Sequence, residues 1–401
     1  MMVIGGFFRS RPVDCGIWKE VYDMKSKYWK YVSRMLKFIA LVVPLVCFIM
    51  FAQEHLFYYE DDNTRRIEQF YEEEENSLDV VLMGASEVTN DFSPGYAYEN
   101  YGFTSYMYAV DFNRGTTYLS QLKEILKYQD PQVIVVEVYG FLVPSTWNGY
   151  DEARFRLYTE SIPFSWNKAQ TILEQPFEDK LSYFVPFVKY HGNLGEAQKR
   201  LAKIGEAEPV LPDLKGMNSI STVYDGEGDE GDTFDSADFA LNEDIEKALI
   251  EFLEYCDAEG VDNVLFVNFP RVLVDDNHNS NMEAAKKVGQ ILNRYGHELV
   301  NLQKEKEQIG LDENRDFADA HHLNIYGQMK LTDYLGSKML NEFNVVPVAQ
   351  STENQQKWEK CASDTRVHFE MMDVLISKGE EQWVTELAYK QLSPAQILGE
   401  S

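Results

Sequence analysis

The sequence predicts an α/β fold with a parallel sheet, preceded by one transmembrane helix. Three observations support this prediction. Short strands rich in Val, Ile and Leu alternate with stretches of helical apolar spacing after residue 78, which is typical of a parallel sheet covered on both faces. An uncharged apolar run lies near the N-terminus. The chain has 401 residues, 44% of them hydrophobic, enough for one large domain or two moderate ones.

The apolar run Phe38–Ala52 (FIALVVPLVCFIMFA) predicts a membrane anchor over residues 35–59, because flanking apolar residues extend it toward the roughly 20 residues that a spanning helix needs. Basic residues precede it and acidic residues follow it. Positively charged flanks stay in the cytoplasm, so we expect residues 1–34 to be cytoplasmic and the rest extracytoplasmic. A cleaved signal peptide and a buried core helix are the alternatives. The long leader without a small-x-small cleavage site argues against a signal peptide.

Residues 60–77 are strongly charged and predict a solvated helical stalk. The α/β domain is expected over residues 78–343. Its predicted strands and helices follow from runs of apolar residues at the period of each element. The strands are Leu78–Met83, Phe103–Val110, Val133–Val138, Val264–Phe269 and Glu298–Asn301, and the helices are Thr116–Tyr128, Glu243–Glu259, Asn281–Tyr295 and Ile325–Phe343.

The strand–helix alternation stops between residues 140 and 241. This aromatic-rich insertion predicts a lid or a substrate-shaping region. It ends in the acidic stretch Asp225–Asp232 (DGEGDEGD), which resembles a calcium loop but lacks the required offsets, so we expect a solvated loop. The tail, residues 344–401, has mixed helical segments that we expect to pack back on the domain.

Composition excludes several functional classes. The formal net charge is −29, which argues against nucleic acid as a partner, because phosphates need a basic surface. The four cysteines include no CxxC pair, so neither a zinc site nor a disulfide framework is expected. Cys256 and Cys361 are interpreted as buried thiols, with pairing as the alternative. No metal-binding histidine spacing is present, and no cofactor is predicted.

Ser86 is the first candidate for chemistry. It stands in Gly-Ala-Ser-Glu directly after the first predicted strand. Ligands of parallel sheets bind beyond the carboxyl ends of strands, where backbone N–H groups can hold an oxyanion. A serine that merely caps a turn or helix is the alternative.

Asp319 and His322 form the second candidate, just before the last predicted helix. The Asp-x-x-His spacing lets the carboxylate accept a hydrogen bond from the imidazole and leaves the other ring nitrogen free as a base. A serine nucleophile needs such a base. A capping Asp beside a surface His is the alternative. His321 is a neighbouring competitor with less suitable spacing.

One serine after the first strand and one Asp-x-x-His before the last helix resemble the SGNH (GDSL-type) hydrolase pattern. The segments VLMGASEVTNDFSP, DPQVIVVEVYGF, VPFVKYHGNLGE, DLKGM and DFADAHHLNIYGQMKLTDYL are similar in order and type to membrane-anchored bacterial envelope proteins of this group. These are alginate O-acetyltransferase-like and teichoic-acid D-alanyl transfer proteins. The resemblance implies a three-layer α/β/α, flavodoxin-like fold with Ser86 as nucleophile, His322 as base and Asp319 as its orienter.

Four further residues are candidates with less defined roles. The family's oxyanion-hole glycine and asparagine have no clear match, and Gly115 and Asn113, after the second strand, are the candidates here. Glu137 ends the third strand, where a polar side chain could face the site. His191, in Tyr-His-Gly-Asn, matches a recurring histidine of the look-alike group, which implies either substrate contact or a structural role.

The sequence therefore predicts O-acyl transfer or ester hydrolysis on a cell-envelope polysaccharide or a teichoic-acid-like polymer. The resemblance implies a membrane-bound O-acyltransferase partner that passes acyl groups across the membrane. The alternative is a non-catalytic polymer-binding or assembly component of an envelope polysaccharide machine, motivated by the acidic, aromatic-rich ectodomain and the unclear oxyanion hole.

Overall fold

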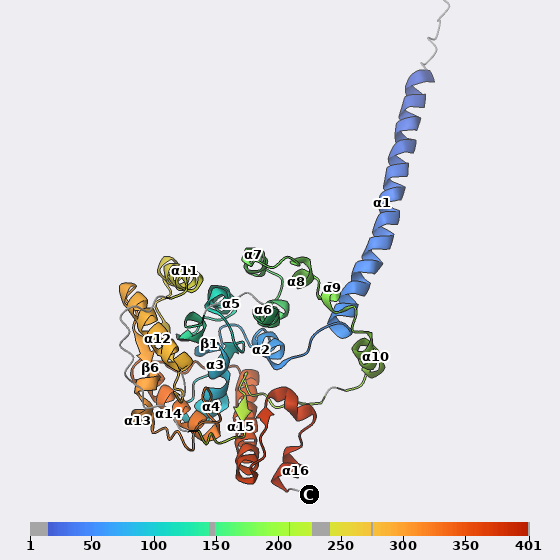
Figure 1. Ribbon diagram of the computed structural model, residues 1–401. Helices are drawn as coiled ribbons and strands as arrows, with labels where there is room; N and C mark the ends of the chain where they lie inside the picture. The colour runs from blue at the N-terminus through green and yellow to red at the C-terminus, as the bar shows by residue number, and fades with distance from the viewer. Residues whose placement is uncertain (1–14, 144–148, 208, 227–240, 274–275, 400–401) are drawn as a thin grey trace, which may run out of the picture. The chain divides into compact units, whose positions relative to one another are not determined.

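The computed structural model describes residues 15–143, 149–207, 209–226, 241–273 and 276–399. The chain divides into two compact units. The anchor unit comprises residues 1–58 and 185–205, and the α/β unit comprises residues 59–184 and 206–401. Figure 1 labels the elements of both units.

A parallel five-stranded sheet forms the centre of the α/β unit, in the order β2-β1-β3-β5-β6. The strands are β1 (Val80–Gly84), β2 (Ser105–Ala109), β3 (Val133–Glu137), β5 (Val264–Asn268) and β6 (Leu299–Asn301). Each lies within a predicted strand or extends it by one residue. β1 pairs with a neighbour on each side, so the residues after it lie at the sheet's carboxyl edge between the ends of β2 and β3.

Alternate strand residues enter two different hydrophobic clusters, one on each face of the sheet. Val81 and Met83 of β1 pack with residues of α5 (Tyr118–Tyr128) and α11 (Glu243–Glu259). The neighbouring residues of the strand pack with α4 (Pro94–Tyr101) and α14 (Ile325–Asn341). Figure 1 shows these helix pairs on opposite sides of the strands. The predicted α/β class with a parallel sheet is therefore confirmed.

The remaining elements connect and cover the sheet. They are α2 (Asp62–Phe70), α3 (Ser86–Asp91), η1 (Gly115–Thr117), η2 (Val138–Phe141), α6 (Gly149–Ser161), α7 (Trp166–Glu174), α8 (Leu181–Phe184), β4 (Ser219–Ile220), α12 (Asp276–Arg294), η3 (Leu302–Lys304), α13 (Lys306–Ile309), α15 (Thr352–Lys378), β7 (Trp383–Val384), η4 (Glu386–Lys390) and α16 (Pro394–Leu398).

The segment predicted to be a solvated stalk is instead part of the α/β unit, so that prediction was wrong. α2 is capped by the Asp61 side chain and buries Ile67 and Phe70 in the core. Arg66, also buried, donates hydrogen bonds to Gly216 O (2.9 Å) and Ala109 O (3.1 Å). A charged helix can pack in this way because carbonyl oxygens satisfy its buried guanidinium.

The tail packs on the α/β unit, as predicted. Trp358 and Cys361 of α15 are fully buried. β7 pairs antiparallel with β4 of the insertion, which forms a second, two-stranded sheet. The insertion is mostly helical up to Lys203, and its described residues after that are irregular apart from β4. Residues 227–232 of the acidic stretch lie outside the described residues. Cys256 and Cys361 are both buried free thiols, so the alternative of a disulfide between them was wrong.

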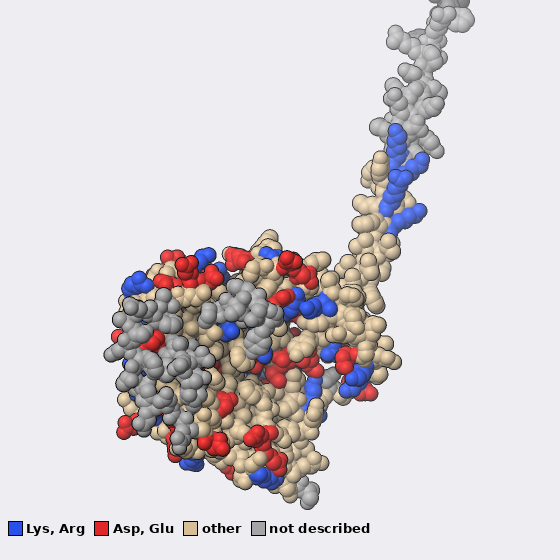
Figure 2. Space-filling model, in the orientation of Figure 1, with Lys and Arg blue, Asp and Glu red and all other residues tan. Residues whose placement is uncertain are grey.

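The anchor unit contains α1 (Cys15–His55), α9 (Pro186–Tyr190) and α10 (Leu194–Lys203). Lys27–His55 of α1 is long and apolar enough to cross a membrane by length and composition. Its apolar side chains are largely exposed, as lipid-facing residues would be. Figure 2 shows basic side chains on the N-terminal described part of this helix, with uncharged residues following them.

Candidate active site

Ser86 lies at the turn between the interior strand β1 and the helix α3, of which it is the first residue. Gly84, the last residue of β1, adopts φ +157°, and a Cβ at this position would lie 2.6 Å from Glu137 Cβ and 2.8 Å from Val88 Cγ2. Only glycine therefore allows this strand to approach its neighbour β3 and turn sharply into α3. The turn places the buried Ser86 side chain beyond the carboxyl end of β1.

Asp319 and His322 lie in the loop that precedes α14. Asn324 caps this helix by accepting hydrogen bonds from the backbone N–H groups of Tyr326 (3.0 Å) and Gly327 (3.5 Å). Its side-chain amide donates to Arg315 O (2.7 Å) and Phe317 O (3.2 Å). Asn324 thereby holds the two ends of the loop together, which fixes the position of the residues between them.

A backbone contact joins this loop to the serine helix. Leu323 N–H donates to Asp91 Oδ1 at 2.9 Å, and Asp91 is the last residue of α3, the helix that begins at Ser86. Both residues are buried. The contact positions the base-bearing loop directly against the helix that carries the serine.

The structure brings Ser86, His322 and Asp319 together. His322 Nε2 lies 2.9 Å from Ser86 Oγ. His322 Nδ1 lies 2.9 Å from Asp319 Oδ2 and 3.1 Å from Oδ1. An ionised carboxylate only accepts hydrogen bonds, so Nδ1 carries the proton and Nε2 is free to accept the serine proton. This is the hydrogen-bond order that nucleophilic serine chemistry requires.

Burial and mutual contact shift the pKa values of both His322 and Asp319. Burial lowers the pKa of His322, but the hydrogen bond and the charge of Asp319 outweigh it, so the pKa lies above its ordinary value. Burial alone would raise the pKa of Asp319. The contacts with His322 and with two backbone N–H groups outweigh this effect, so the pKa lies below its ordinary value. Asp319 therefore remains ionised wherever His322 titrates.

Asn113 and Gly115 have other contacts within the protein. Asn113 Nδ2 donates to Gln121 Oε1 (2.8 Å) and to Gly84 O (3.4 Å), and its Oδ1 accepts from Thr117 Oγ1 (2.6 Å). Asn113 thus joins the loop after β2 to the end of β1. A Cβ at Gly115 would lie 2.3 Å from the Phe141 ring, so this glycine allows close packing of η1 on η2. Their role in an oxyanion hole stays a prediction.

Glu137 supports the turn that carries Ser86. One carboxylate oxygen accepts a hydrogen bond from Ala85 N–H (3.3 Å) and the other from Tyr139 N–H. Burial and the nearby charge of Glu87 raise its pKa well above the ordinary value, against the opposing charge of Arg271. The contacts of Glu137 are thus with the backbone beside Ser86, and a substrate contact stays untested.

His191 belongs to the anchor unit, at the end of α9. It is exposed, and its Nδ1 lies 2.8 Å from Val188 O. Its ring lies 5.8 Å from that of Phe187. These contacts are local, and they neither support nor exclude the predicted substrate contact.

A buried ion pair beside Ser86 was missed by the sequence reasoning. Arg271 Nη2 lies 2.5 Å from Glu87 Oε1, and both side chains are buried. The Arg271 guanidinium also lies 4.4 Å from the centre of the Tyr139 ring. Glu87 follows Ser86 directly and Arg271 follows β5, so their positions beyond strand ends were the signal that could have found them.

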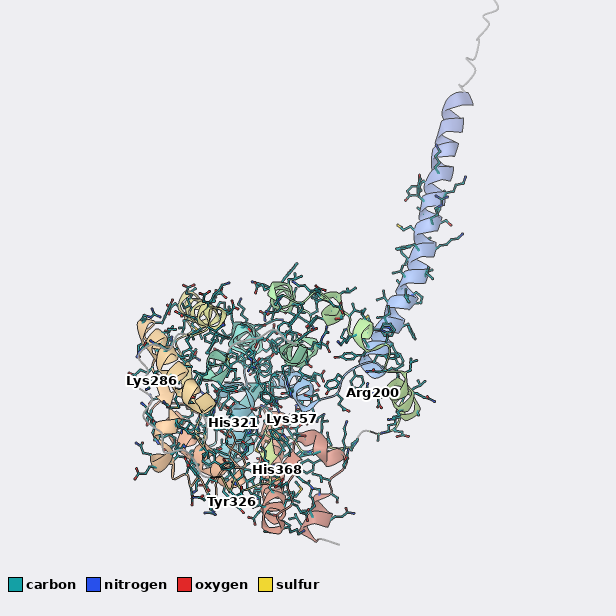
Figure 3. All side chains as sticks on the ribbon, in the orientation of Figure 1. Arg200, Lys286, His321, Tyr326, Lys357 and His368 are labelled. Atoms are coloured by element: carbon teal, nitrogen blue, oxygen red, sulfur yellow. The ribbon has the colours of Figure 1, made fainter. Side chains whose placement is uncertain are left out.

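Trp383 is the second residue that sequence reasoning did not connect with the site. Its ring lies 5.6 Å from the His322 ring, at an interplanar angle of 80°. Trp383 is 45% exposed and stands in β7, which β4 holds in place. A buried histidine of α15, His368, is labelled in Figure 3. It further fixes this region, since its ring nitrogens lie 2.9 Å from Ser219 Oγ and 2.8 Å from Tyr389 Oη. The tail therefore places the Trp383 ring beside His322.

Comparisons with models of protein families, with curated proteins and with solved structures find no match to this chain. Among the residues whose side chains the structure describes, no group of three or more His, Cys, Asp or Glu side chains is arranged to hold a metal ion.

Proposed function

We propose that the protein transfers or hydrolyses O-linked acyl groups at Ser86, in the manner of an SGNH-type enzyme. The observation that carries this proposal is the continuous hydrogen-bond chain from Asp319 through His322 to Ser86 Oγ, with 2.9 Å at each junction. The serine follows an interior strand of a parallel sheet and lies at the carboxyl edge, where such sheets bind ligands.

The mechanism follows from the positions of these atoms. His322 Nε2 removes the proton of Ser86 Oγ, and the oxygen attacks the carbonyl carbon of an acyl ester. The tetrahedral intermediate collapses when the same imidazole returns the proton to the departing alcohol oxygen. An acyl-serine remains, and Asp319 stabilises the imidazolium that forms in each step.

The second half of the reaction reverses the first with a new acceptor. His322 deprotonates a sugar hydroxyl, which attacks the acyl-serine and becomes the new ester, or it deprotonates water, which releases the free acid. Ser86 regains its proton from His322 in either case. Backbone N–H groups close to Ser86 are the proposed oxyanion donors, with Gly115 as a further candidate.

We propose a cell-envelope polysaccharide or a teichoic-acid-like polymer as the substrate. The exposed ring of Trp383 beside His322 supports a carbohydrate, since an aromatic face offers apolar contact to a sugar ring while leaving its hydroxyl groups to polar neighbours. The apolar helix α1 supports a place at the membrane. Its basic N-terminal flank favours a cytoplasmic N-terminus and an extracytoplasmic α/β unit.

In this proposal the insertion, residues 140–241, serves as a lid or substrate-shaping region, and a membrane-bound O-acyltransferase supplies the acyl groups. Both statements rest on the resemblance to the SGNH-like envelope proteins. Co-purification of the full chain with such a multi-spanning protein, and loss of acyl delivery in its absence, would test the partnership.

The test of the proposed chemistry compares the wild type with Ser86→Ala on an activated acetyl ester. We expect the variant to lose the activity almost completely and to resist labelling by a serine-reactive fluorophosphonate. Ser105→Ala is the matched control, because Ser105 is also a buried serine of this sheet region and its Oγ has no hydrogen-bond partner among the described residues. Equal rates in the wild type and the Ser86 variant would remove Ser86 as the nucleophile.

A second candidate function is non-catalytic binding of an envelope polymer. It is favoured by the side chain of Asn113, which already forms hydrogen bonds with Gln121, Thr117 and Gly84. An oxyanion donor in the place of the family's asparagine is therefore unassigned. Undiminished polymer binding by Ser86→Ala, together with a wild type that never forms an acyl-enzyme, would support this function over catalysis.

A further inference from the structure

The segment between Val185 and Gly205 lies in the insertion, but it forms a compact unit with the N-terminal helix α1. Four contacts join it to residues 56–58, which directly follow that helix. The rings of Phe57 and Phe187 meet edge to face at 5.3 Å. Arg200 donates hydrogen bonds to Leu56 O (3.2 Å) and Tyr58 O (2.7 Å), and its guanidinium stacks 3.7 Å from the Tyr58 ring. Figure 3 labels Arg200 at this junction.

These contacts fix the level of α10 along α1. The buried residue Ala197 of α10 packs in one cluster with Ala52 and Phe57. Ala52 lies three residues before His55, the end of the apolar span, which is about 5 Å along a helix axis. If α1 crosses a membrane, α10 therefore lies at the height where the acyl chains give way to the headgroups.

α10 is amphipathic, and its large apolar side chains are exposed. Leu194 and Leu201, seven residues apart, lie on one side of the helix together with Ile204 directly after it. Their exposed fractions are 68%, 57% and 51%. Lys199 and Lys203 lie on the other side. Three large apolar side chains exposed together, two on a short helix and one on the residue after it, are unusual for a surface that faces water.

The charge of the segment also differs from that of the chain. Residues 185–205 contain four Lys or Arg and one Glu, whereas the whole chain carries a formal charge of −29. Acidic chains are repelled by anionic lipid headgroups, and each basic residue near such a surface is attracted to it. A basic polar side opposite an exposed leucine side is typical of helices that lie in a membrane interface.

We infer that α9 and α10 lie in the outer interface of the lipid bilayer, with Leu194, Leu201 and Ile204 in the acyl boundary and Lys199 and Lys203 among the headgroups. The inference rests on the membrane-spanning role proposed for α1. The lipid surface is favoured over a protein partner, because the segment is packed on the end of the apolar span and its basic side matches lipid phosphate. The segment would then hold the junction of α1 and the following chain at a fixed depth.

The test measures depth in the bilayer with the full chain in vesicles of zwitterionic and anionic lipid. A fluorophore is attached to Leu201→Cys or to Lys199→Cys, in a background with Cys15→Ser and Cys47→Ser. Cys256 and Cys361 are buried and stay unlabelled in the folded protein. Lipids that carry a spin label high on the acyl chain quench the fluorescence of groups at the interface.

We expect quenching at residue 201 to exceed quenching at residue 199 by about twofold or more, because the two positions face lipid and headgroups respectively. Equal and weak quenching at both positions would overturn the inference. Shielding of residue 201 only in native membranes, and not in pure lipid, would also overturn it and would indicate a protein partner. Both positions are exposed, and thermal unfolding of each labelled protein checks that it is folded.

Failure of the anchor and failure of this inference give different results. If α1 does not cross the membrane, the wild-type chain does not sediment with the vesicles at all. If α1 does cross it but α10 stands in water, the chain sediments and residue 201 is not quenched. Neither readout depends on chemistry at Ser86.

Discussion

Replacement of Asp319 by Asn tests the proposed mechanism most directly, because the hydrogen bonds of this carboxylate decide which tautomer His322 adopts. Asp319 Oδ1 accepts the backbone N–H groups of His321 (2.7 Å) and His322 (2.9 Å). The amide oxygen of an asparagine must take this place, because these donors need an acceptor. The amide nitrogen then occupies the position of Oδ2, 2.9 Å from His322 Nδ1.

This exchange reverses the hydrogen bond to the imidazole. The amide N–H donates to Nδ1, so the ring proton moves to Nε2, the atom that faces Ser86 Oγ at 2.9 Å. An Nε2 that already carries a proton cannot accept the one from serine. Correct base catalysis is worth about 10²- to 10⁴-fold, so we expect kcat/KM for an activated acetyl ester to fall by that amount in Asp319→Asn.

The pH dependence provides a second readout. His322 acts as a base only when neutral, so kcat/KM of the wild type rises with pH through a pKa above the ordinary value of about 6.5. The Asn variant lacks the hydrogen bond and charge that raise this pKa, while burial still lowers it. The residual activity should therefore rise at a lower pH than that of the wild type. The Asp319 contribution to stability is present above the ordinary carboxyl pKa and is lost as pH falls through the lowered one.

Asp312→Asn is the matched control, since Asp312 Oδ1 also accepts a backbone N–H two residues on, from Asn314 (3.0 Å), in an exposed turn. It should leave kcat/KM and its pH profile unchanged. The reasoning is refuted if Asp319→Asn keeps more than about a third of the activity with an unshifted pH profile, while thermal unfolding shows a folded protein.

Three further predictions concern the surroundings of the triad. Arg271→Met should reduce the free energy of unfolding by about 3–5 kcal/mol in urea titrations, because it leaves Glu87 buried without its counter-charge. The double variant Arg271→Met/Glu87→Gln should recover part of this loss. A cost below about 1 kcal/mol for Arg271→Met alone would contradict the pairing. Trp383→Ala should lower kcat/KM on a polymeric or oligosaccharide substrate by about tenfold, since one aromatic stacking contact contributes about 1 kcal/mol. It should change the rate on a small activated ester by less than about twofold. Equal effects on both substrates would refute a sugar-binding role for Trp383. Gly84→Ala should reduce the free energy of unfolding by about 2 kcal/mol or more, because the new Cβ would lie 2.6 Å from Glu137 Cβ. Unchanged stability in thermal or urea unfolding would show that the turn accommodates a side chain.

The parallel sheet could be predicted because its signals are local. The helix α11 matches its predicted bounds, since Asn242 caps its start and Gly260 ends it in a left-handed conformation. The α2 segment was misread because its charges suggested solvent, whereas Arg66 is satisfied by carbonyl oxygens from residues far along the chain. No local pattern reports such distant partners.

The candidate site divides in the same way. The three residues of the hydrogen-bond chain could be identified because strand ends and the Asp-x-x-His spacing are visible in the sequence. Arg271 and Trp383 could not, because their places depend on how a loop after β5 and the tail fold over the sheet. The candidate oxyanion residues show a further limit: chain order indicates which residues follow β2, but not which amide groups are already engaged within the fold.

The pairing of β4 with β7 has a consequence for when the site comes into existence. Ser86 stands early in the chain, His322 late, and Trp383 only 18 residues before the last residue of the 401-residue sequence. During synthesis, Ser86 therefore emerges long before His322 and Trp383. The arrangement of these three side chains forms only once residues 322 and 383 have been made and His322 has folded against Ser86 and Trp383 beside His322. A shortened version that ends near residue 343 would lose this ring, and it would also lose α15, whose Trp358 and Cys361 are fully buried in the α/β unit.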